Sequence, residues 1–254
     1  MKIAGKIVVV TGAASGIGRA LAKRFAAEGA ALVVSADRDA AGSQASAVET
    51  GGAAFTTDVA HEADSRALIE GVELNHGPID LFISNAGIGI AGGAEASDES
   101  WQKIWDINVM AHVWAARHMV PRMVARGGGY MMSTASAAGL LSQIGSAPYA
   151  VTKHAAVALA EWLAITHGDD GIKVSVLCPQ AVRTAMTAAN PDGVASIDGM
   201  MEPDEVAEAC IKAIEAETFL ILPHPEVLDY MRRKTGDYDR WLGGMRKLNR
   251  RFRR

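Results

Sequence analysis

Short apolar runs rich in β-branched residues alternate along the chain with longer, alanine-rich segments in which apolar residues recur at the helical period. Runs of strand length cover residues 7–10, 31–35, 53–56, 81–84, 129–133, 174–177 and 219–222. Helical periodicity covers residues 16–28, 38–49, 62–75, 99–125, 149–167 and 203–215. Strands that are each followed by a helix are typical of a parallel sheet with helices on both faces. We therefore predict an α/β fold with a doubly wound parallel sheet of about seven strands.

No linker, repeat or low-complexity stretch interrupts residues 1–254, so we predict a single domain. Two segments fall outside the alternation of strands and helices. Residues 185–201 combine methionines with glycine, proline and small residues, which favours an adaptable flap over an apolar substrate. Residues 226–254 form a C-terminal extension with helical periodicity.

The C-terminal extension is strongly basic. From Met231 to Arg254 there are ten Lys/Arg and two Asp/Glu, so this segment carries +8 and the rest of the chain −12. Clustered basic residues can bind nucleic acid or an anionic membrane. Apolar residues at helical spacing favour instead a helix that packs on the acidic body of the chain or on a neighbouring subunit; they are Tyr238, Trp241, Leu242, Met245 and Leu248. We therefore expect neither nucleic acid nor a membrane as a partner.

Composition narrows the class of protein further. With 49% hydrophobic residues the chain can bury a core, which excludes a disordered protein. The uncharged stretch 127–152 is broken by glycines and Pro148, so it does not suit a membrane span, and the apolar run 7–10 is too short for an export signal. Cys178 and Cys210 are expected to be buried thiols of a cytoplasmic protein. The histidines show no metal-binding spacing, so we expect no metal site.

Ligands of an open parallel sheet bind at the carboxyl ends of its strands, and the first such end is rich in glycine. Thr11-Gly12-Ala13-Ala14-Ser15-Gly16-Ile17-Gly18 joins the first predicted strand to the first predicted helix. Glycines allow a tight turn close to a pyrophosphate, and free N–H groups at the start of a helix can bind its charge. The spacing G-x-x-x-G-x-G between a strand and a helix therefore predicts a dinucleotide site.

A second glycine-rich segment matches the spacing G-x-G-x-x-G literally. Residues 87–92 are Gly-Ile-Gly-Ile-Ala-Gly and follow a predicted strand. However, no helix is predicted to begin at Gly92, and no acidic residue ends a strand about 20 residues later. We therefore do not expect this segment to bind the pyrophosphate.

Asp37 ends the second predicted strand and indicates which dinucleotide binds. A carboxylate at this position can accept hydrogen bonds from both ribose hydroxyls of adenosine and repels a 2′-phosphate. Asp37 therefore predicts NAD as the cofactor, with NADP less favoured. Arg38 and Arg19 are the residues that favour NADP instead.

Tyr149 and Lys153 are four residues apart in a segment that is predicted to begin a helix, so their side chains share one face. A tyrosine acts as a base near neutral pH only if its pKa falls by about three units from about 10. A neighbouring ammonium and an oxidised, cationic nicotinamide favour such a fall. Ser136, just past the fifth predicted strand, can place a hydroxyl against the same substrate oxygen. Taken alone, the tyrosine and lysine pair is more typical of simple packing in which the lysine stem is buried.

Together these segments resemble the short-chain dehydrogenase/reductase family. The matching set spans about Lys6 to Met186 and comprises, in the order of the family, Thr11 to Gly18, Asp58-Val59, Asn85-Ala86-Gly87, Asn108, Ser136, Tyr149-x-x-x-Lys153 and Pro179. The resemblance implies a single-domain Rossmann-type fold with a seven-stranded parallel sheet, usually assembled as a homodimer or homotetramer. It also implies an NAD(P)-dependent oxidoreductase that acts on alcohols and ketones.

The resemblance implies a role for each matching residue. Tyr149 would be the general acid/base, Lys153 would lower its pKa and hold the nicotinamide ribose, and Ser136 would polarise the substrate oxygen. Asn108 would anchor a water molecule on a proton path. The implied cofactor-binding residues are Gly12, Ser15, Gly16, Ile17, Gly18, Asp37, Arg38, Asp58, Val59, Asn85, Ala86, Gly87, Tyr149, Lys153, Pro179, Val182 and Thr184.

Substrate identity is the least constrained part of the prediction. Many relatives have Pro-Gly where this chain has Pro179-Gln180, so Gln180 is a candidate for substrate contact, together with Gln143 and Met186. No cluster of arginines marks a carboxylate or phosphate site in the substrate region, where Arg183 is the single candidate. We therefore expect a secondary alcohol or ketone with an apolar body, although a sugar, polyol or acyl-carrier substrate stays open.

Two alternative functions also stay open. The first is an NADPH-dependent ketone or 3-oxoacyl reductase. The second is a non-catalytic dinucleotide-binding sensor or scaffold, which has no need of an acid/base pair.

Overall fold

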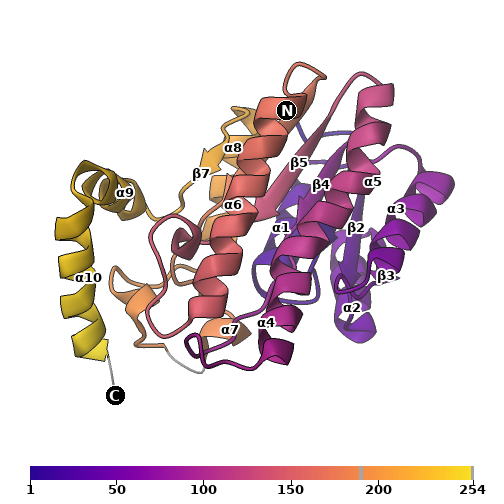
Figure 1. Cartoon of the computed structure of the whole chain (residues 1–254). Helices are drawn as coiled ribbons and strands as arrows, with labels where there is room; N and C mark the ends of the chain where they lie inside the picture. The colour runs from indigo at the N-terminus through magenta and orange to yellow at the C-terminus, as the bar shows by residue number, and fades with distance from the viewer. Residues whose placement is uncertain (189–190, 253–254) are drawn as a thin grey trace.

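The computed structural model describes residues 1–188 and 191–252, and its described part contains a seven-stranded parallel sheet (Figure 1). The strands are β1 (Ile7–Thr11), β2 (Leu32–Asp37), β3 (Ala53–Thr56), β4 (Leu81–Ser84), β5 (Gly129–Thr134), β6 (Ile172–Leu177) and β7 (Leu220–Ile221). Their order is β3-β2-β1-β4-β5-β6-β7, and every pairing is parallel. The direction of winding reverses between β1 and β4, and a doubly wound sheet binds its ligand at such a point. The predicted Rossmann-type fold is confirmed.

Helices cover both faces of the sheet and form a separate core on each. On one face lie α1 (Gly16–Ala27) and α8 (Pro203–Glu215), with α2 (Ala40–Thr50) beside α1. On the other lie α3 (Glu62–His76), α5 (Ala111–Ala125) and α6 (Ala147–His167). Side chains of β1 alternate between the two cores: Val8 and Val10 pack beneath α1 and α8, whereas Val9 packs on the opposite side. Burial on both faces explains why the strands read as continuous apolar runs.

One predicted helix differs from the structure. Residues 99–125 were expected to form a single helix, but α4 (Asp98–Trp105) is joined to α5 by a π-helical turn over Asp106–Met110. The wider turn contains Asn108 and directs its side chain toward the backbone of Ile88. Such turns carry no hydrophobic-periodicity signal, and they occur frequently at functional sites.

The C-terminal extension forms two helices at one side of the molecule, α9 (Glu226–Gly236) and α10 (Tyr238–Phe252) (Figure 1). We predicted a helix that packs on the body of the chain or on a neighbouring subunit. Within the described residues α10 packs mainly against α9, and none of its side chains is buried. Of the predicted flap, residues 185–201, the structure describes α7 (Ala185–Ala188) and residues 191–201, while Ala189 and Asn190 lie outside the described residues. None of the described helices is long and apolar enough to cross a membrane.

Candidate active site

A cleft of about 2080 Å³ follows the carboxyl ends of the strands. Its walls come from the glycine-rich loop after β1, the ends of β2, β4, β5 and β6, the loop before α6, the flap, and one face of α9 and α10. All of the predicted cofactor-binding residues line this cleft, and so do Ser136, Gln143, Gln180 and Met186. Asn108 is fully buried behind the wall and does not line it. Among the described residues, no group of three or more His, Cys, Asp or Glu could hold a metal ion.

The glycine-rich loop is shaped for an anion. Gly12 and Gly16 adopt left-handed φ values of 68° and 53°, which favour glycine. A Cβ atom on Gly18 would lie 2.1 Å from the backbone oxygen of Gly12, so the turn closes only with glycine there. The side chain of Ser15 does not cap α1, and the first turn holds no acidic residue. The N–H groups at this helix start are therefore free to bind a pyrophosphate, and the residues present fit a dinucleotide.

Asp37 lies at the end of β2 beside this loop. Its Oδ2 accepts a hydrogen bond from the N–H of Ala14 at 3.0 Å, and its Oδ1 accepts one from the N–H of Asp39 at 3.0 Å. These bonds fix the carboxylate against the glycine-rich loop. Of the two residues that favour NADP, Arg19 is bound to Glu49 and lies outside the cleft, whereas Arg38 is exposed and lines it.

A polar network that was not predicted from the sequence joins three strand ends. The hydroxyl of Thr11 accepts from the N–H groups of Asn85 (2.9 Å) and Ala86 (3.2 Å), and Asn85 Nδ2 donates to the backbone oxygen of Thr11 (3.0 Å). The hydroxyl of Thr134 donates to Asn85 Oδ1 at 3.0 Å. Thr11 begins the predicted glycine-rich motif, but its support of Asn85 was not predicted. Threonine at a strand end also suits strand propensity, so no separate signal marked Thr134 as a support of the site.

Asn108 holds the loop after β4. Its Oδ1 accepts from the N–H of Ile88, and its Nδ2 donates to the backbone oxygen of Ile88, both at 2.9 Å. Nδ2 also donates to the hydroxyl of Thr152 at 3.3 Å. These bonds make Asn108 a support for the wall of the cleft, and the water-anchoring role implied by the family resemblance stays a prediction.

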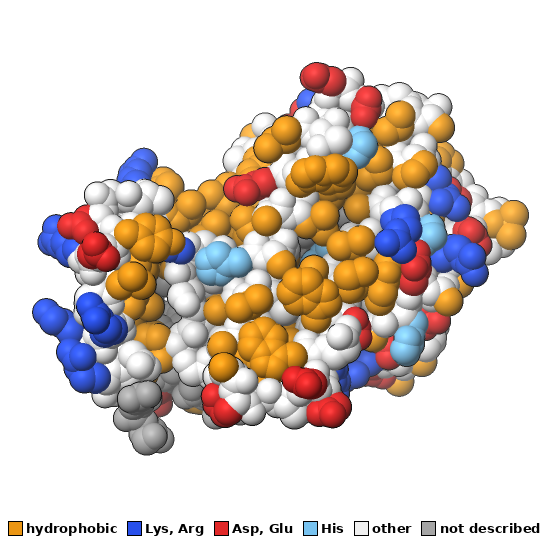
Figure 2. Space-filling model, in the orientation of Figure 1, with side chains coloured by type: hydrophobic (Ala, Val, Ile, Leu, Met, Phe, Trp, Pro, Cys, Tyr) orange, Lys and Arg blue, Asp and Glu red, His pale blue; other side chains and the backbone are white. Residues whose placement is uncertain are grey.

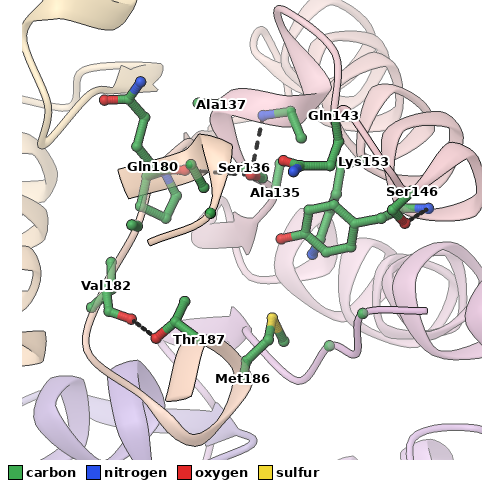
Figure 3. A pocket seen from close by; sticks show the side chains of 18 of the residues that line it. Ala135, Ser136, Ala137, Gln143, Ser146, Lys153, Gln180, Val182, Met186 and Thr187 are labelled. Atoms are coloured by element: carbon green, nitrogen blue, oxygen red, sulfur yellow. Dashed lines mark hydrogen bonds between the residues drawn. The ribbon is translucent and has the colours of Figure 1, made fainter. Parts of the chain in front are cut away.

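Tyr149, Ser136 and Lys153 meet at the end of the cleft beyond the glycine-rich loop. Tyr149 lies in the first turn of α6, where its N–H donates to the hydroxyl of Ser146 at 3.3 Å. Lys153 Nζ lies 5.7 Å from the centre of the Tyr149 ring and donates to the backbone oxygen of Thr134 at 2.9 Å. Ser136 Oγ accepts from the N–H of Ala138 at 3.1 Å and donates to the backbone oxygen of Pro179 at 3.3 Å. Figure 3 shows Ser136 and Lys153 on the same side of the pocket.

Burial dominates the protonation of this group. It lowers the pKa of Lys153 to about 8 and raises the pKa of Tyr149, an effect that the nearby hydroxyl of Ser136 opposes. We expected Lys153 to lower the pKa of Tyr149, but in the protein alone desolvation of the phenol outweighs any such effect. The buried lysine loses part of its own charge for the same reason.

The candidate substrate residues differ in how free their polar groups are. Gln180 lines the cleft, but its Nε2 donates to Asp198 at 3.1 Å, and in Figure 3 its amide points away from Ser136 and Lys153. Gln143 donates to the backbone oxygen of Ile144 at 3.2 Å. Met186, in α7 of the flap, is 51% exposed and turns into the pocket in Figure 3.

The arginines near the cleft are distributed differently from what the sequence suggested. We expected Arg183 to be the single candidate for an anion site, and it is paired with Glu202 at 2.6 Å. The structure brings Arg233, Arg240 and Arg251 from α9 and α10 to the rim of the cleft. These residues were recognisable only as part of a basic tail, because nothing in their spacing shows where that tail folds back.

Comparisons with known proteins identify the family. Residues 6–194 match the short chain dehydrogenase family. The chain is 34% identical to meso-2,3-butanediol dehydrogenase from Serratia marcescens, over 82% of this chain and 86% of that protein. It is also 34% identical to 1-deoxy-11-beta-hydroxypentalenate dehydrogenase from Streptomyces exfoliatus, over 93% of this chain and 90% of that protein.

A solved structure has the same fold. It is that of a short-chain dehydrogenase/reductase from Burkholderia phymatum in complex with NAD, which superposes with a TM-score of 0.86 at 30% identity over 94% of this chain and 96% of that one. The sheet topology, the glycine-rich loop and the family match together show that the chain belongs to the short-chain dehydrogenase family, whose members are oxidoreductases that act on CH–OH groups.

Proposed function

We propose that the protein transfers a hydride between NAD and a secondary alcohol or ketone with an apolar body, with Tyr149 as the general acid/base. The observation that carries this proposal is the arrangement along one cleft. The glycine-rich loop and Asp37 lie at one end, and Tyr149, Ser136 and Lys153 lie together at the other. A binding module needs only the first half of this arrangement, which argues against a non-catalytic sensor.

The residues at the reacting end divide the chemistry among them. NAD, when bound, supplies the carbon that accepts the hydride from the substrate C–H bond. Tyr149, ionised, takes the hydroxyl proton, so that the alcohol loses one hydride and one proton and becomes a ketone. Ser136 can donate to the substrate oxygen in place of the oxygen of Pro179. Lys153 has three donors and uses one on Thr134, so others stay available for the ribose hydroxyls.

The cofactor preference rests on the adenosine end of the cleft. Relatives of this fold have been solved with NAD and with NADPH, so the family alone does not decide. Two N–H groups bind the Asp37 carboxylate, and a negative charge near the adenosine ribose would repel a 2′-phosphate, which supports NAD. Because Arg19 is bound to Glu49, only Arg38 supports the NADPH-dependent alternative.

The choice of substrate class rests on the cleft walls and on the relatives. Met186, Ile144 and Ile197 line the reacting end and favour an apolar substrate body. The names of the two related enzymes, a diol dehydrogenase and a hydroxypentalenate dehydrogenase, both describe oxidation of an alcohol.

The test is a screen of secondary alcohols and ketones with each dinucleotide, followed by the absorbance of the reduced nicotinamide. We expect turnover with NAD and a fall of about 10²- to 10⁴-fold in Tyr149→Phe, the usual contribution of a general acid/base. Tyr238→Phe, which changes an exposed tyrosine outside the cleft, is the matched control and should keep wild-type rates. Retention of most activity by Tyr149→Phe would exclude its proposed role, and a clear preference for NADPH would show that the interpretation of Asp37 is wrong.

A further inference from the structure

The C-terminal helix pair, α9 and α10, is tied to both edges of the cleft. Lys234 Nζ donates to the backbone oxygens of Leu140 (2.7 Å) and Leu141 (3.2 Å), in the loop between Ser136 and Tyr149. On the flap side, the hydroxyl of Tyr230 donates to Asp198 Oδ1 at 2.9 Å, and the same carboxylate accepts from Gln180. These contacts tie α9 to both sides of the cleft, and α10 packs against α9.

The inner face of α10 is apolar and forms part of the cleft wall. Trp241, Met245, Leu248 and Phe252 follow one another at helical spacing, line the cleft and are half-buried. The outer face is charged and exposed, as in Arg246. The whole cleft of about 2080 Å³ exceeds the roughly 300–1,000 Å³ of a usual small-molecule site, so it has room for a dinucleotide and a sizeable second ligand.

The rim of this part of the cleft carries an excess of positive charge. Arg233, Arg240 and Arg251 line it, and among the described residues none of the three has a carboxylate oxygen within 4 Å. Two carboxylates, Asp192 and Asp237, line the same region, so three positive charges face two negative ones. The backbone N–H of Arg240 donates to Asp237 Oδ1 at 3.0 Å. Figure 2 shows Lys and Arg side chains gathered at this end of the molecule.

Two of the three arginines are steadied by aromatic rings. The guanidinium of Arg233 lies 5.8 Å from the centre of the Tyr230 ring, and that of Arg251 lies 6.0 Å from that of Phe252. A guanidinium group offers paired donors that match a carboxylate, and stacking on a ring leaves those donors free. We call the part of the cleft beneath the inner face of α10 the apolar channel. Beside it lie guanidinium groups that, within residues 1–188 and 191–252, have no carboxylate oxygen within 4 Å, so this region is suited to a ligand with an apolar body and an anionic group.

We infer that the substrate is an amphipathic hydroxy- or keto-carboxylate. Its alcohol or ketone lies at Tyr149, its apolar body lies beneath the inner face of α10, and its carboxylate is bound by the arginines Arg233, Arg240 and Arg251. The inference rests on the proposed function and adds the anionic group to it.

The test uses a homologous series of straight-chain (ω−1)-hydroxy carboxylates and their methyl esters, assayed with NAD. At the chain length that spans the channel, we expect KM for the carboxylate to be about tenfold or more below that for the ester, the usual gain from a hydrogen bond to a charged group. In Arg240→Gln and Arg233→Gln this ratio should approach one. Arg246→Gln, on the outer face of the same helix, is the matched control and should keep the wild-type ratio.

Calorimetric titration of the carboxylate into NADH-saturated protein gives a second readout that does not require turnover. Binding that weakens in Arg240→Gln but not in Arg246→Gln supports the inference. Equal oxidation of esters and acids, unaffected by Arg240→Gln, would overturn it while leaving hydride transfer intact. Absence of NAD reduction with this series and with a broad alcohol library would overturn the proposed function itself. Met245→Glu tests whether a second copy of the chain occupies this part of the cleft. If Met245→Glu changed the oligomeric state, and the KM ratio of ester to carboxylate stayed at the wild-type value in both arginine variants, a second copy would lie there and the inference would be wrong.

Discussion

At the scale of single residues, burial of the charged Lys153 ammonium lowers the stability of the folded protein. Its side chain is only 3% exposed, and burial lowers its pKa from 10.5 to about 8. Holding the charged form in the fold therefore costs about 3 kcal/mol relative to the unfolded chain. A lysine that served packing alone would carry its charge to the surface, as long cationic side chains usually do.

From the lowered pKa of Lys153 we predict how the free energy of unfolding changes with pH. Between pH 8 and 10.5 the folded protein has lost the Lys153 proton while the unfolded chain still binds it, so the free energy of unfolding rises with pH in this window. Below pH 8 the full cost is present. Relative to Lys153→Met, the wild-type protein without cofactor should gain about 3 kcal/mol as the pH rises through this window. Urea unfolding across the range measures this difference.

The exposed Lys23 of α1 provides the control for this experiment. Lys23→Met, which removes an exposed lysine, is unfolded over the same pH range and controls for the loss of a lysine in general. If the difference in the free energy of unfolding between the wild-type protein and Lys153→Met did not change with pH, Lys153 would be charged at little cost, and the account of its burial would be incorrect.

At the scale of elements, the strands and helices were largely predictable and the site only partly so. Helix α8 begins and ends at the predicted residues, and the predicted strand 53–56 is β3 without change, because hydrophobic period and end signals act over a few neighbouring residues. The glycine-rich loop and Asp37 could be placed for the same reason. The π-helical turn around Asn108 and the return of α10 toward the cleft depend on contacts between distant segments, which no local period encodes.

At the scale of elements, we predict the effect of replacing Gly18 in the turn between β1 and α1. A Cβ atom on Gly18 would lie 2.1 Å from Gly12 O and 2.7 Å from Asn85 Nδ2, so Gly18→Ala forces the helix start away from both. We expect a loss of about 1–3 kcal/mol of stability, as in other overpacked sites, together with weaker NAD binding. Denaturant unfolding and calorimetric titration with NAD measure the two effects.

Gly243→Ala is the matched control for the turn. Gly243 lies inside α10, and an added Cβ there meets nothing within 4 Å. Helix propensity favours alanine by about 1 kcal/mol, so this variant should not lose stability. Equal behaviour of Gly18→Ala and Gly243→Ala would show that the turn adapts, and that close backbone approach is not what the glycine provides.

At the scale of the whole molecule, the described surface leaves an apolar face on α6 without cover. Val151, Trp162 and Ile165 share one side of this helix and are 46%, 56% and 83% exposed. Figure 2 shows hydrophobic side chains spread over the surface formed by α5 and α6. Scattered exposed apolar residues are ordinary, but Trp162 and Ile165 are three residues apart on one helix face and together expose two large apolar side chains, which is typical of an interaction surface. We propose that this face is buried between copies of the chain, in a homodimer or homotetramer.

Charge placed on that face should separate the copies. Trp162→Glu combined with Ile165→Glu puts carboxylates into a contact that would otherwise exclude water, where an unpaired charge is strongly unfavourable. Sedimentation velocity should show an assembly for the wild-type protein and a monomer for the double variant, with the far-ultraviolet circular dichroism unchanged. Leu74→Glu, at an isolated and 85% exposed position on α3, should leave the assembly intact and so controls for added charge alone. A wild-type protein that sediments as a monomer would contradict the proposed assembly. A double variant that keeps the mass of a wild-type assembly would place the subunit contact elsewhere on the molecule.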